Sequence, residues 1–232
     1  FFLATFLKML YHRNKTKIRL RIIIVGRQEE SMIKNIVFDV GNVLATFQPK
    51  EFLNDFYKDV KTAQDLYTLF FEERLWHAYD QGLYSAATLK KAAIKRMPCY
   101  KEEIERLIPT WARYVKPFDR SIQLMKQLKE EGYKIYILSN IPEDSYQYFI
   151  EHNNIFADVD GGIYSYQDRL IKPDPAIFQL LLSRYDLKAQ ECLFIDDKEE
   201  NTQAARQLGF HVITLRNPEE IKQKVREKIH EV

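Results

Sequence analysis

The run Ile36-Val37-Phe38-Asp39 is the first indication of the fold of this chain, because it is short, apolar and ends in a carboxylate. Two later stretches have the same form: 135–139 (IYILS) ends in a hydroxyl, and 192–197 (CLFIDD) ends in two carboxylates. Apolar runs of this length predict strands that are buried on both faces of a parallel sheet. Ligands bind beyond the carboxyl ends of such strands, so we expect Asp39, Ser139, Asp196 and Asp197 to share one site.

Helical patterns alternate with these strands in the C-terminal half of the chain. The segment 118–131 has helical apolar spacing and stops at Gly132, and the segment 201–208 stops in the same way at Gly209, before a fourth apolar run at 211–215. This βαβ order predicts an α/β fold, a doubly wound parallel sheet with helices on both sides.

The region 48–116 lacks strand patterns and is predicted to be an inserted helical cap domain. Four helices are expected, at 51–59, 62–75, 85–95 and 101–114, with Ser85 as an N-cap. Residues 32–47 and 117–232 would then form the α/β core. An insertion directly after the first strand would lie over the strand carboxyl ends as a lid.

The first 31 residues are predicted to be an N-terminal extension outside the fold, with Met32 as the functional start. The apolar run at 1–7 is too short for a transmembrane helix and precedes its basic residues, unlike a secretory signal. A fragment of a membrane-proximal segment is the alternative interpretation.

The charge and the cysteine content of the chain indicate which binding partners and which cellular location to expect. Residues 32–232 contain 28 Lys and Arg against 31 Asp and Glu, so no basic face predicts nucleic-acid binding. No membrane association is expected of this part. Cys99 and Cys192 lie far apart in the sequence, and this fits a reducing, cytoplasmic location.

The carboxylates are candidates for nucleophile and metal ligands. Asp39 precedes a turn of small residues and would point into the crevice, where it could form a covalent intermediate; alternatively, it caps the turn. Adjacent Asp196 and Asp197 repel each other unless a cation binds them, and oxygen ligands of this kind suit Mg²⁺. The alternative is that one caps the next helix and the other is solvated.

Two further segments are candidates for anion binding. The Ser139 hydroxyl and the backbone N–H of Asn140 precede a proline-started helix and could bind phosphate oxygens, although such residues also serve as simple caps. Lys172 is framed by Pro173 and Pro175, with Asp174 as the expected N-cap, at a loop-to-helix entrance; a lone lysine is otherwise a solvated surface residue.

Together these segments resemble the haloacid dehalogenase superfamily over residues 32–216, within the subfamily that has a helical cap of the first type. The resemblance implies a Rossmann-like core and a Mg²⁺-dependent phosphatase in which Asp39 becomes an aspartyl phosphate. It implies that Ser139 and Lys172 bind the phosphoryl group. The metal ligands implied are Asp39, the Gly41 backbone carbonyl and Asp196, with Asp197 acting at longer range or through water. For Asn201 we expect a capping role.

One position departs from the family pattern. Most phosphatases of this family have a general acid two residues after the nucleophile, where this chain has Gly41. Its loss favours phosphate esters with good leaving groups, and the Asp-x-Gly-Asn-Val form resembles a branch containing sugar-1-phosphate phosphatases. We therefore expect a small phosphorylated substrate, with a sugar 1-phosphate as the first candidate. Within 76–82 (WHAYDQG), where a substitute acid would be sought, structural roles are expected for His77 and Asp80.

Two other functions stay open at this point. A protein that kept the fold but lost turnover would bind a phosphorylated ligand or a partner, and Gly41 motivates that alternative. A metal-free hydrolase acting on carbon–halogen bonds is the second, although the Asp196 and Asp197 pair argues against it.

Overall fold

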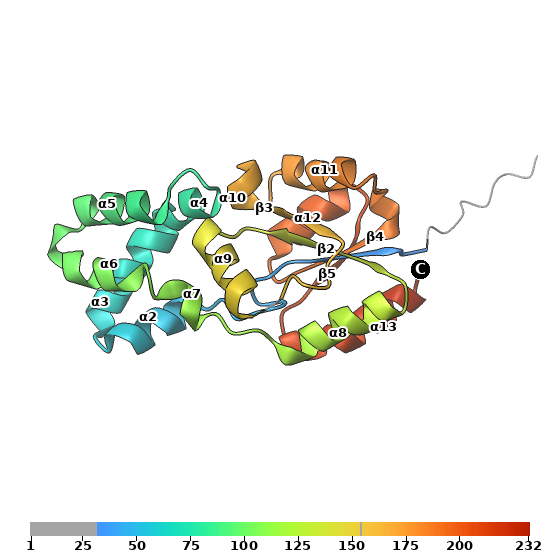
Figure 1. Cartoon of the computed structure of the whole chain (residues 1–232), viewed down its shortest axis with the longest axis horizontal. Coiled ribbons are helices and arrows are strands. Elements are labelled where there is room, and N and C mark those ends of the chain that lie inside the picture. Colours follow the sequence, from blue (N-terminus) through green and yellow to red (C-terminus); the bar gives the residue numbers. More distant parts are fainter. Residues whose placement is uncertain (1–31, 154) are drawn as a thin grey trace, which may run out of the picture. The chain divides into compact units, whose positions relative to one another are not determined.

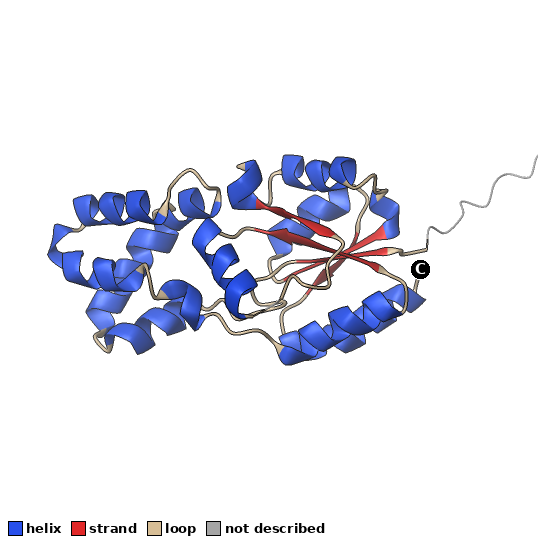
Figure 2. Ribbon diagram, viewed as in Figure 1, coloured by secondary structure: helices blue, strands red, loops and turns tan. Residues whose placement is uncertain are grey.

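The computed structural model describes residues 32–153 and 155–232, and the extension predicted at 1–31 lies outside these described residues. A five-stranded sheet has the order β3-β2-β1-β4-β5, and every neighbouring pair of strands is parallel (Figures 1 and 2). The strands are β1 (Asn35–Phe38), β2 (Lys134–Ser139), β3 (Gly161–Tyr164), β4 (Cys192–Asp196) and β5 (His211–Thr214). This is the predicted Rossmann-like α/β fold.

Alternate side chains of each strand enter two different hydrophobic clusters, as the two-residue period of a strand requires. Ile36 and Phe38 of β1 pack on one face, with helices α8 (Asp119–Glu130) and α13 (Ile221–His230). Val37 packs on the other face, with α11 (Pro175–Arg184) and α12 (Glu199–Gln207). Figure 1 shows these two helix pairs on opposite sides of the sheet. Burial on both faces explains why the strands are almost continuously apolar.

Strand β3 was not predicted, because it begins with the pair Gly161 and Gly162, which lack the side chains that mark a strand. Its place at the sheet edge is fixed by Tyr185, whose hydroxyl accepts a hydrogen bond from the Gly162 N–H (2.8 Å) and donates one to the Gly162 carbonyl (3.0 Å). A side chain from beyond α11 therefore replaces the packing that the glycines cannot supply.

The region between β1 and α8 contains only helices, which we call the helical segment (residues 49–114). It comprises α2 (Pro49–Tyr57), α3 (Val60–Tyr67), a π-helical stretch (Thr68–Glu72), α4 (Leu75–Asp80), α5 (Ala86–Arg96), α6 (Lys101–Leu107) and α7 (Trp111–Tyr114). Its aromatic core, which includes Phe70, Trp76 and Trp111, is separate from the two sheet clusters.

The helices of this segment are shorter and more numerous than the four predicted. The expected helix 62–75 is interrupted at Arg74, whose φ of 62° is left-handed, and Asp59 rather than Thr62 begins α3 as its N-cap. The expected helix 101–114 is divided near Pro109, as a proline inside a helical pattern would cause. Ser85 caps α5 as predicted, accepting a hydrogen bond from the Thr88 N–H (3.2 Å).

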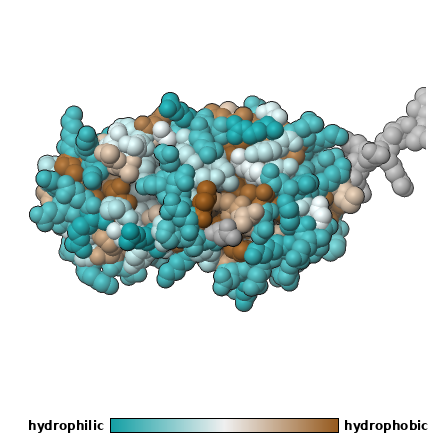
Figure 3. Space-filling model, in the orientation of Figure 1, coloured by the Kyte–Doolittle hydropathy of each residue, from teal (hydrophilic) through white to brown (hydrophobic). Residues whose placement is uncertain are grey.

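The helical segment lies beyond the carboxyl ends of the strands (Figures 1 and 2). Helix α4 contacts α10 (Ser165–Asp168), and α7 contacts α9 (Glu143–His152). The molecular face seen in Figure 3 is mostly hydrophilic, with hydrophobic side chains in small groups. Within the described residues, no helix combines the length and apolar character needed to cross a membrane.

Candidate active site

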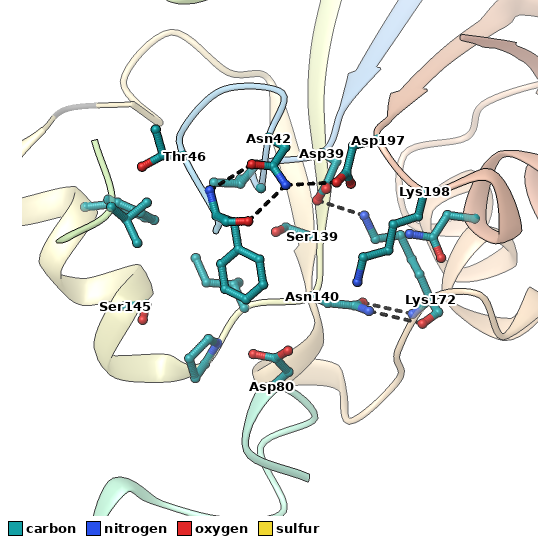
Figure 4. Close-up of a pocket in the computed structure, with 18 of the residues that line it drawn as sticks. Asp39, Asn42, Thr46, Asp80, Ser139, Asn140, Ser145, Lys172, Asp197 and Lys198 are labelled. Atoms are coloured by element: carbon teal, nitrogen blue, oxygen red, sulfur yellow. Dashed lines mark hydrogen bonds and ion pairs between the residues drawn. The ribbon is translucent and has the colours of Figure 1, made fainter. Parts of the chain in front are cut away.

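Three neighbouring strands end at the same edge of the sheet, and their last side chains meet there. Asp39 follows β1, Ser139 ends β2 and Asp196 ends β4. One carboxylate oxygen from each of Asp39, Asp196 and Asp197 lies within 4.8 Å of the others. The pocket at this edge is also lined by Ser139, Asn140, Gly41 and Lys172 (Figure 4). All seven residues that the sequence indicated are thus brought to one place, although Asp196 lies behind the pocket wall rather than on it.

Lys172 forms the electrostatic centre of this group. Its Nζ atom lies 2.8 Å from Asp39 Oδ1 and 2.6 Å from Asp196 Oδ2, and its side chain is only 1% exposed. It enters from the loop before α11, where the Lys172–Pro173 peptide bond is cis and Asp174 caps the helix by accepting from the Ala176 N–H (2.9 Å). Lys172 is therefore a buried ion-pair partner and not a solvated surface lysine.

Asn140 holds the backbone of Lys172. Its side-chain Oδ1 accepts from the Lys172 N–H (2.9 Å) and its Nδ2 donates to the Lys172 carbonyl (3.1 Å). Figure 4 shows this double hydrogen bond crossing from the end of β2 to the lysine loop. The sequence suggested only a role for the Asn140 backbone, whereas the side chain fixes the position of Lys172.

Asp196 has hydrogen-bond donors on both carboxylate oxygens, which explains how it tolerates complete burial. Besides Lys172, it accepts from the Lys198 N–H (2.9 Å) and from Asn201 Nδ2 (2.9 and 3.0 Å). The expected capping role of Asn201 is therefore wrong. Asn201 is buried at the start of α12 and binds the carboxylate directly.

Asp197 is held by Asn42, a residue that the sequence analysis did not single out. Asn42 Nδ2 donates to Asp197 Oδ2 (3.0 Å), while the rest of its amide group bonds to the backbone of Phe47. Asn42 has a left-handed φ of 53°, a conformation that asparagine adopts more readily than most residues. The combination Gly41-Asn42 after a strand was the signal that could have indicated this turn.

Burial and mutual repulsion disturb the protonation of these carboxylates. Burial raises the pKa of Asp39 to about 7; the Lys172 ammonium group opposes the rise, and Asp196 and Asp197 add to it. The pKa of Asp197 is also raised, chiefly by burial. Burial alone would lower the pKa of Lys172, but its two carboxylate partners raise it. One ammonium group thus faces three carboxylates, and a cation would relieve the remaining repulsion.

The helical segment contributes two side chains to the same pocket. Trp111 lines it from α7, and Asp80 lines it from the last residue of α4. Figure 4 shows the Asp80 carboxyl group pointing into the pocket from the side opposite Asn42. Lys198, which also lines the pocket, comes from the loop after β4. We expected only a structural role for Asp80, but Asp80 lines the pocket. His77 is not among the residues that line it.

A family model described as haloacid dehalogenase-like hydrolase matches residues 33–209, about three quarters of the chain. The chain belongs to this hydrolase family. Its match extends from β1 to the end of α12 and so includes every residue of the candidate active site.

Two curated relatives of this family member are phosphatases. It is 27% identical over 177 residues to the sesquiterpene phosphatase astK of Aspergillus oryzae, covering 76% of this chain and 87% of that protein. It is 27% identical over 203 residues to a D-ribitol-5-phosphate phosphatase of Bacteroides thetaiotaomicron, covering 80% and 93%.

The fold of this hydrolase is similar to that of a HAD family enzyme from Bacteroides thetaiotaomicron, solved in complex with magnesium and inorganic phosphate. The TM-score is 0.64 at 23% sequence identity, and the match covers 78% of this chain and 93% of that one.

Proposed function

We propose that this protein is a Mg²⁺-dependent phosphohydrolase that cleaves a small phosphorylated metabolite through an aspartyl-phosphate intermediate on Asp39. The observation that carries the proposal is the buried Lys172, which pairs with Asp39 and Asp196 while Asp197 leaves the group with excess negative charge. The family match and the two phosphatase relatives support the reaction class.

The residues at the strand ends suit Mg²⁺. Three carboxylates with oxygens within 4.8 Å of one another form a hard oxygen donor set, as Mg²⁺ prefers. Asp39, Asp196, Asp197 and the Gly41 backbone carbonyl would hold the ion, which would supply positive charge against the phosphate oxygens. Asn42 and Asn201 orient two of these carboxylates, and such outer partners commonly change metal affinity 10- to 100-fold.

Each residue of the candidate site has a separate role in the proposed reaction. An Asp39 carboxylate oxygen attacks phosphorus, the ester bond to the leaving group breaks, and water later releases inorganic phosphate from Asp39. Ser139 and the Asn140 N–H bind phosphoryl oxygens, while Lys172 supplies a fixed positive charge. Because phosphoryl transfer depends mainly on positioning and charge neutralisation, this arrangement accounts for most of the catalysis.

The substrate class follows from the pocket. A sugar 1-phosphate is one candidate, since Gly41 leaves the usual acid position empty and an anomeric oxygen leaves readily. A leaving group with an apolar face is the second candidate. Several apolar side chains also line the pocket, among them Phe47, Trp111, Val115, Ile141 and Phe149. The name of the Aspergillus relative, a sesquiterpene phosphatase, agrees with the second candidate.

We further propose that residues 48–116 form a cap domain over a core of 32–47 and 117–232, and that the cap determines which leaving group enters. The helical segment has its own core and contributes Asp80 and Trp111 to the pocket, which supports that role. Both cysteines in the described residues are free thiols, in agreement with a cytoplasmic location.

A phosphate-release screen tests this function. The wild-type protein is assayed on sugar 1-phosphates, primary alcohol phosphates and prenyl phosphates, with Mg²⁺ or with a chelator. We expect turnover that requires Mg²⁺, and less than about one thousandth of it in Asp39→Asn, because the nucleophile is removed. Equal activity in Asp39→Asn would refute the nucleophile, and activity that persists in chelator would favour carbon–halogen hydrolysis. Binding without turnover would favour a protein that has lost catalysis.

A further inference from the structure

We propose that Asp80 is the general acid and base of this active site, supplied by the helical segment in place of the family position that Gly41 occupies. This inference rests on the proposed phosphohydrolase function. Asp80 is the last residue of α4, and its carboxyl group points into the pocket that contains Asp39, Ser139 and Lys172 (Figure 4).

Position 41 has no side chain that could supply this group, and Phe47 packs closely against it. A Cβ atom built there would lie 3.3 Å from Phe47 Cβ and 3.6 Å from Phe47 Cγ, so any side chain at position 41 would press against Phe47. Phe47 is held in place by the Asn42 side chain, which bonds to both its N–H and its carbonyl. The turn after β1 is thus built without an acid.

Three contacts with residues 165–169 of the α/β core hold the backbone around Asp80 in place. The Ser165 hydroxyl donates to the Asp80 carbonyl, and Gln81 Nε2 donates to the Arg169 carbonyl (2.9 Å). Gly82 packs so closely that an added Cβ would lie 2.3 Å from the Tyr166 carbonyl oxygen. These contacts determine where the carboxyl group is held relative to the strand ends, as a proton donor in a preorganised site requires.

The surroundings of Asp80 favour a carboxyl group that keeps a proton until it is needed. Burial raises the pKa of Asp80 well above its ordinary value, and Asp39 adds to the rise; the ammonium groups of Lys198 and Lys172 oppose it. Among the described residues, no ion pair within 4.0 Å uses this carboxyl group.

In this role Asp80 donates a proton in the first half-reaction and takes one back in the second. As Asp39 bonds to phosphorus and the ester P–O bond breaks, the Asp80 proton passes to the leaving oxygen, giving the free alcohol and an Asp80 carboxylate. A water molecule then attacks the aspartyl phosphate. The Asp80 carboxylate takes a proton from that water as the Asp39–phosphorus bond breaks, and inorganic phosphate leaves with Asp80 protonated again.

The test compares two esters of similar size whose leaving groups differ in their need for a proton, 4-nitrophenyl phosphate and benzyl phosphate. In Asp80→Asn we expect kcat/KM for benzyl phosphate to fall about 10²- to 10⁴-fold and that for 4-nitrophenyl phosphate to fall less than about tenfold. Stopped-flow should show a burst of one nitrophenol per Asp80→Asn molecule, because the intermediate on Asp39 forms but is hydrolysed slowly. Glu73→Gln is the matched control, an exposed carboxylate in the same segment, and should behave as wild type.

The outcomes separate the two proposals. Equal losses on both esters without a burst would refute the role of Asp80 and leave the phosphohydrolase function standing, as would an unchanged kcat/KM for benzyl phosphate. If the wild-type protein released phosphate neither from these esters nor from any phosphate of the metabolite screen with Mg²⁺ present, the phosphohydrolase function itself would fail, and the role of Asp80 with it.

Discussion

Lys172 is the residue on which the site depends most directly. Its side chain is almost completely buried, and two carboxylates lie within 2.8 Å of its Nζ atom. Removing it would leave the buried Asp39 and Asp196 carboxylates without their cation, which is more costly than losing a surface pair.

We therefore expect Lys172→Met to lower the free energy of unfolding by about 3–5 kcal/mol, measured by urea denaturation in chelator. Lys129→Met is the matched control, because Lys129 also pairs with an aspartate but is 35% exposed, and it should cost about 1 kcal/mol or less. Similar losses in both variants would show that the strand-end carboxylates do not need the lysine.

The sequence indicated the candidate site residues that lie at strand ends, and also the lysine that precedes Pro173 and Pro175. Asp39, Ser139, Asp196 and Lys172 were within reach because parallel strands place their last residues at one edge. The roles of Asn42 and Lys198 and the hydrogen-bond partner of Asn201 could not be predicted, because they depend on loop conformations that no local pattern specifies. Asp80 lay in a segment that sequence marked for inspection, but only the packing of α4 against α10 places its carboxyl group in the pocket.

Among the strands of the sheet, β1, β2, β4 and β5 could be predicted from the sequence, but the edge strand β3 could not. Four of the five strands are marked by apolar runs, whereas β3 depends on Tyr185 and on Asp160, the residue just before it. Asp160 accepts from the Ile135 N–H of β2 (2.9 Å) and from the ammonium groups of Lys129 and Lys134 (2.5 and 3.1 Å). This one carboxylate ties the entry of β3 to β2 and α8.

Asp160→Asn should lower the free energy of unfolding by about 1–2 kcal/mol at neutral pH. Burial alone would raise the pKa of Asp160, but the Ile135 N–H and the two lysines lower it overall. A lowered folded pKa stabilises the fold above the unfolded value of about 3.9, so the difference between variant and wild type should shrink as pH falls below about 4. Denaturation across pH 3–7 measures this, and a difference that grows toward acid would contradict it. Asp158→Asn is the control, because the Asp158 side chain is 45% exposed and its ion pair with Lys126 is long (4.0 Å).

The junction of α4 with α10 depends on one glycine. Gly82 combines a φ of +70° with a close approach to the Tyr166 carbonyl, whereas Gly132 has a φ of +97° and no atom within 4 Å of a built Cβ. Gly132→Ala should therefore cost about 1 kcal/mol for the backbone alone, and Gly82→Ala about 2–4 kcal/mol because a steric clash is added. Thermal unfolding of the pair checks this, and equal losses would mean that the junction adjusts freely.

For the described part of the molecule as a whole, metal binding and stability should be linked, because the carboxylates that would bind Mg²⁺ come from two separate strands of the sheet. At Mg²⁺ concentrations 100-fold above Kd, we expect the folded state to gain about 2.7 kcal/mol. In Asp197→Asn the gain at the same concentration should fall below about 1.5 kcal/mol, given a 10- to 100-fold weaker site. Melting curves with Mg²⁺ and with chelator measure it; a wild-type curve that Mg²⁺ leaves unchanged would refute the linkage.

The Ser165 hydroxyl lies where the helical segment meets the α/β core, and it has an acceptor on each side. Besides the Asp80 carbonyl, the Ile141 carbonyl lies 3.3 Å from the same oxygen, which also accepts from the Ile141 N–H (2.9 Å). If α4 swings outward to let a product escape, the hydroxyl proton can rotate to Ile141 and no buried donor is stranded. The Ile141 carbonyl is thus a second acceptor on the core side of this contact, so losing the bond to Asp80 would leave the Ser165 hydroxyl with a partner.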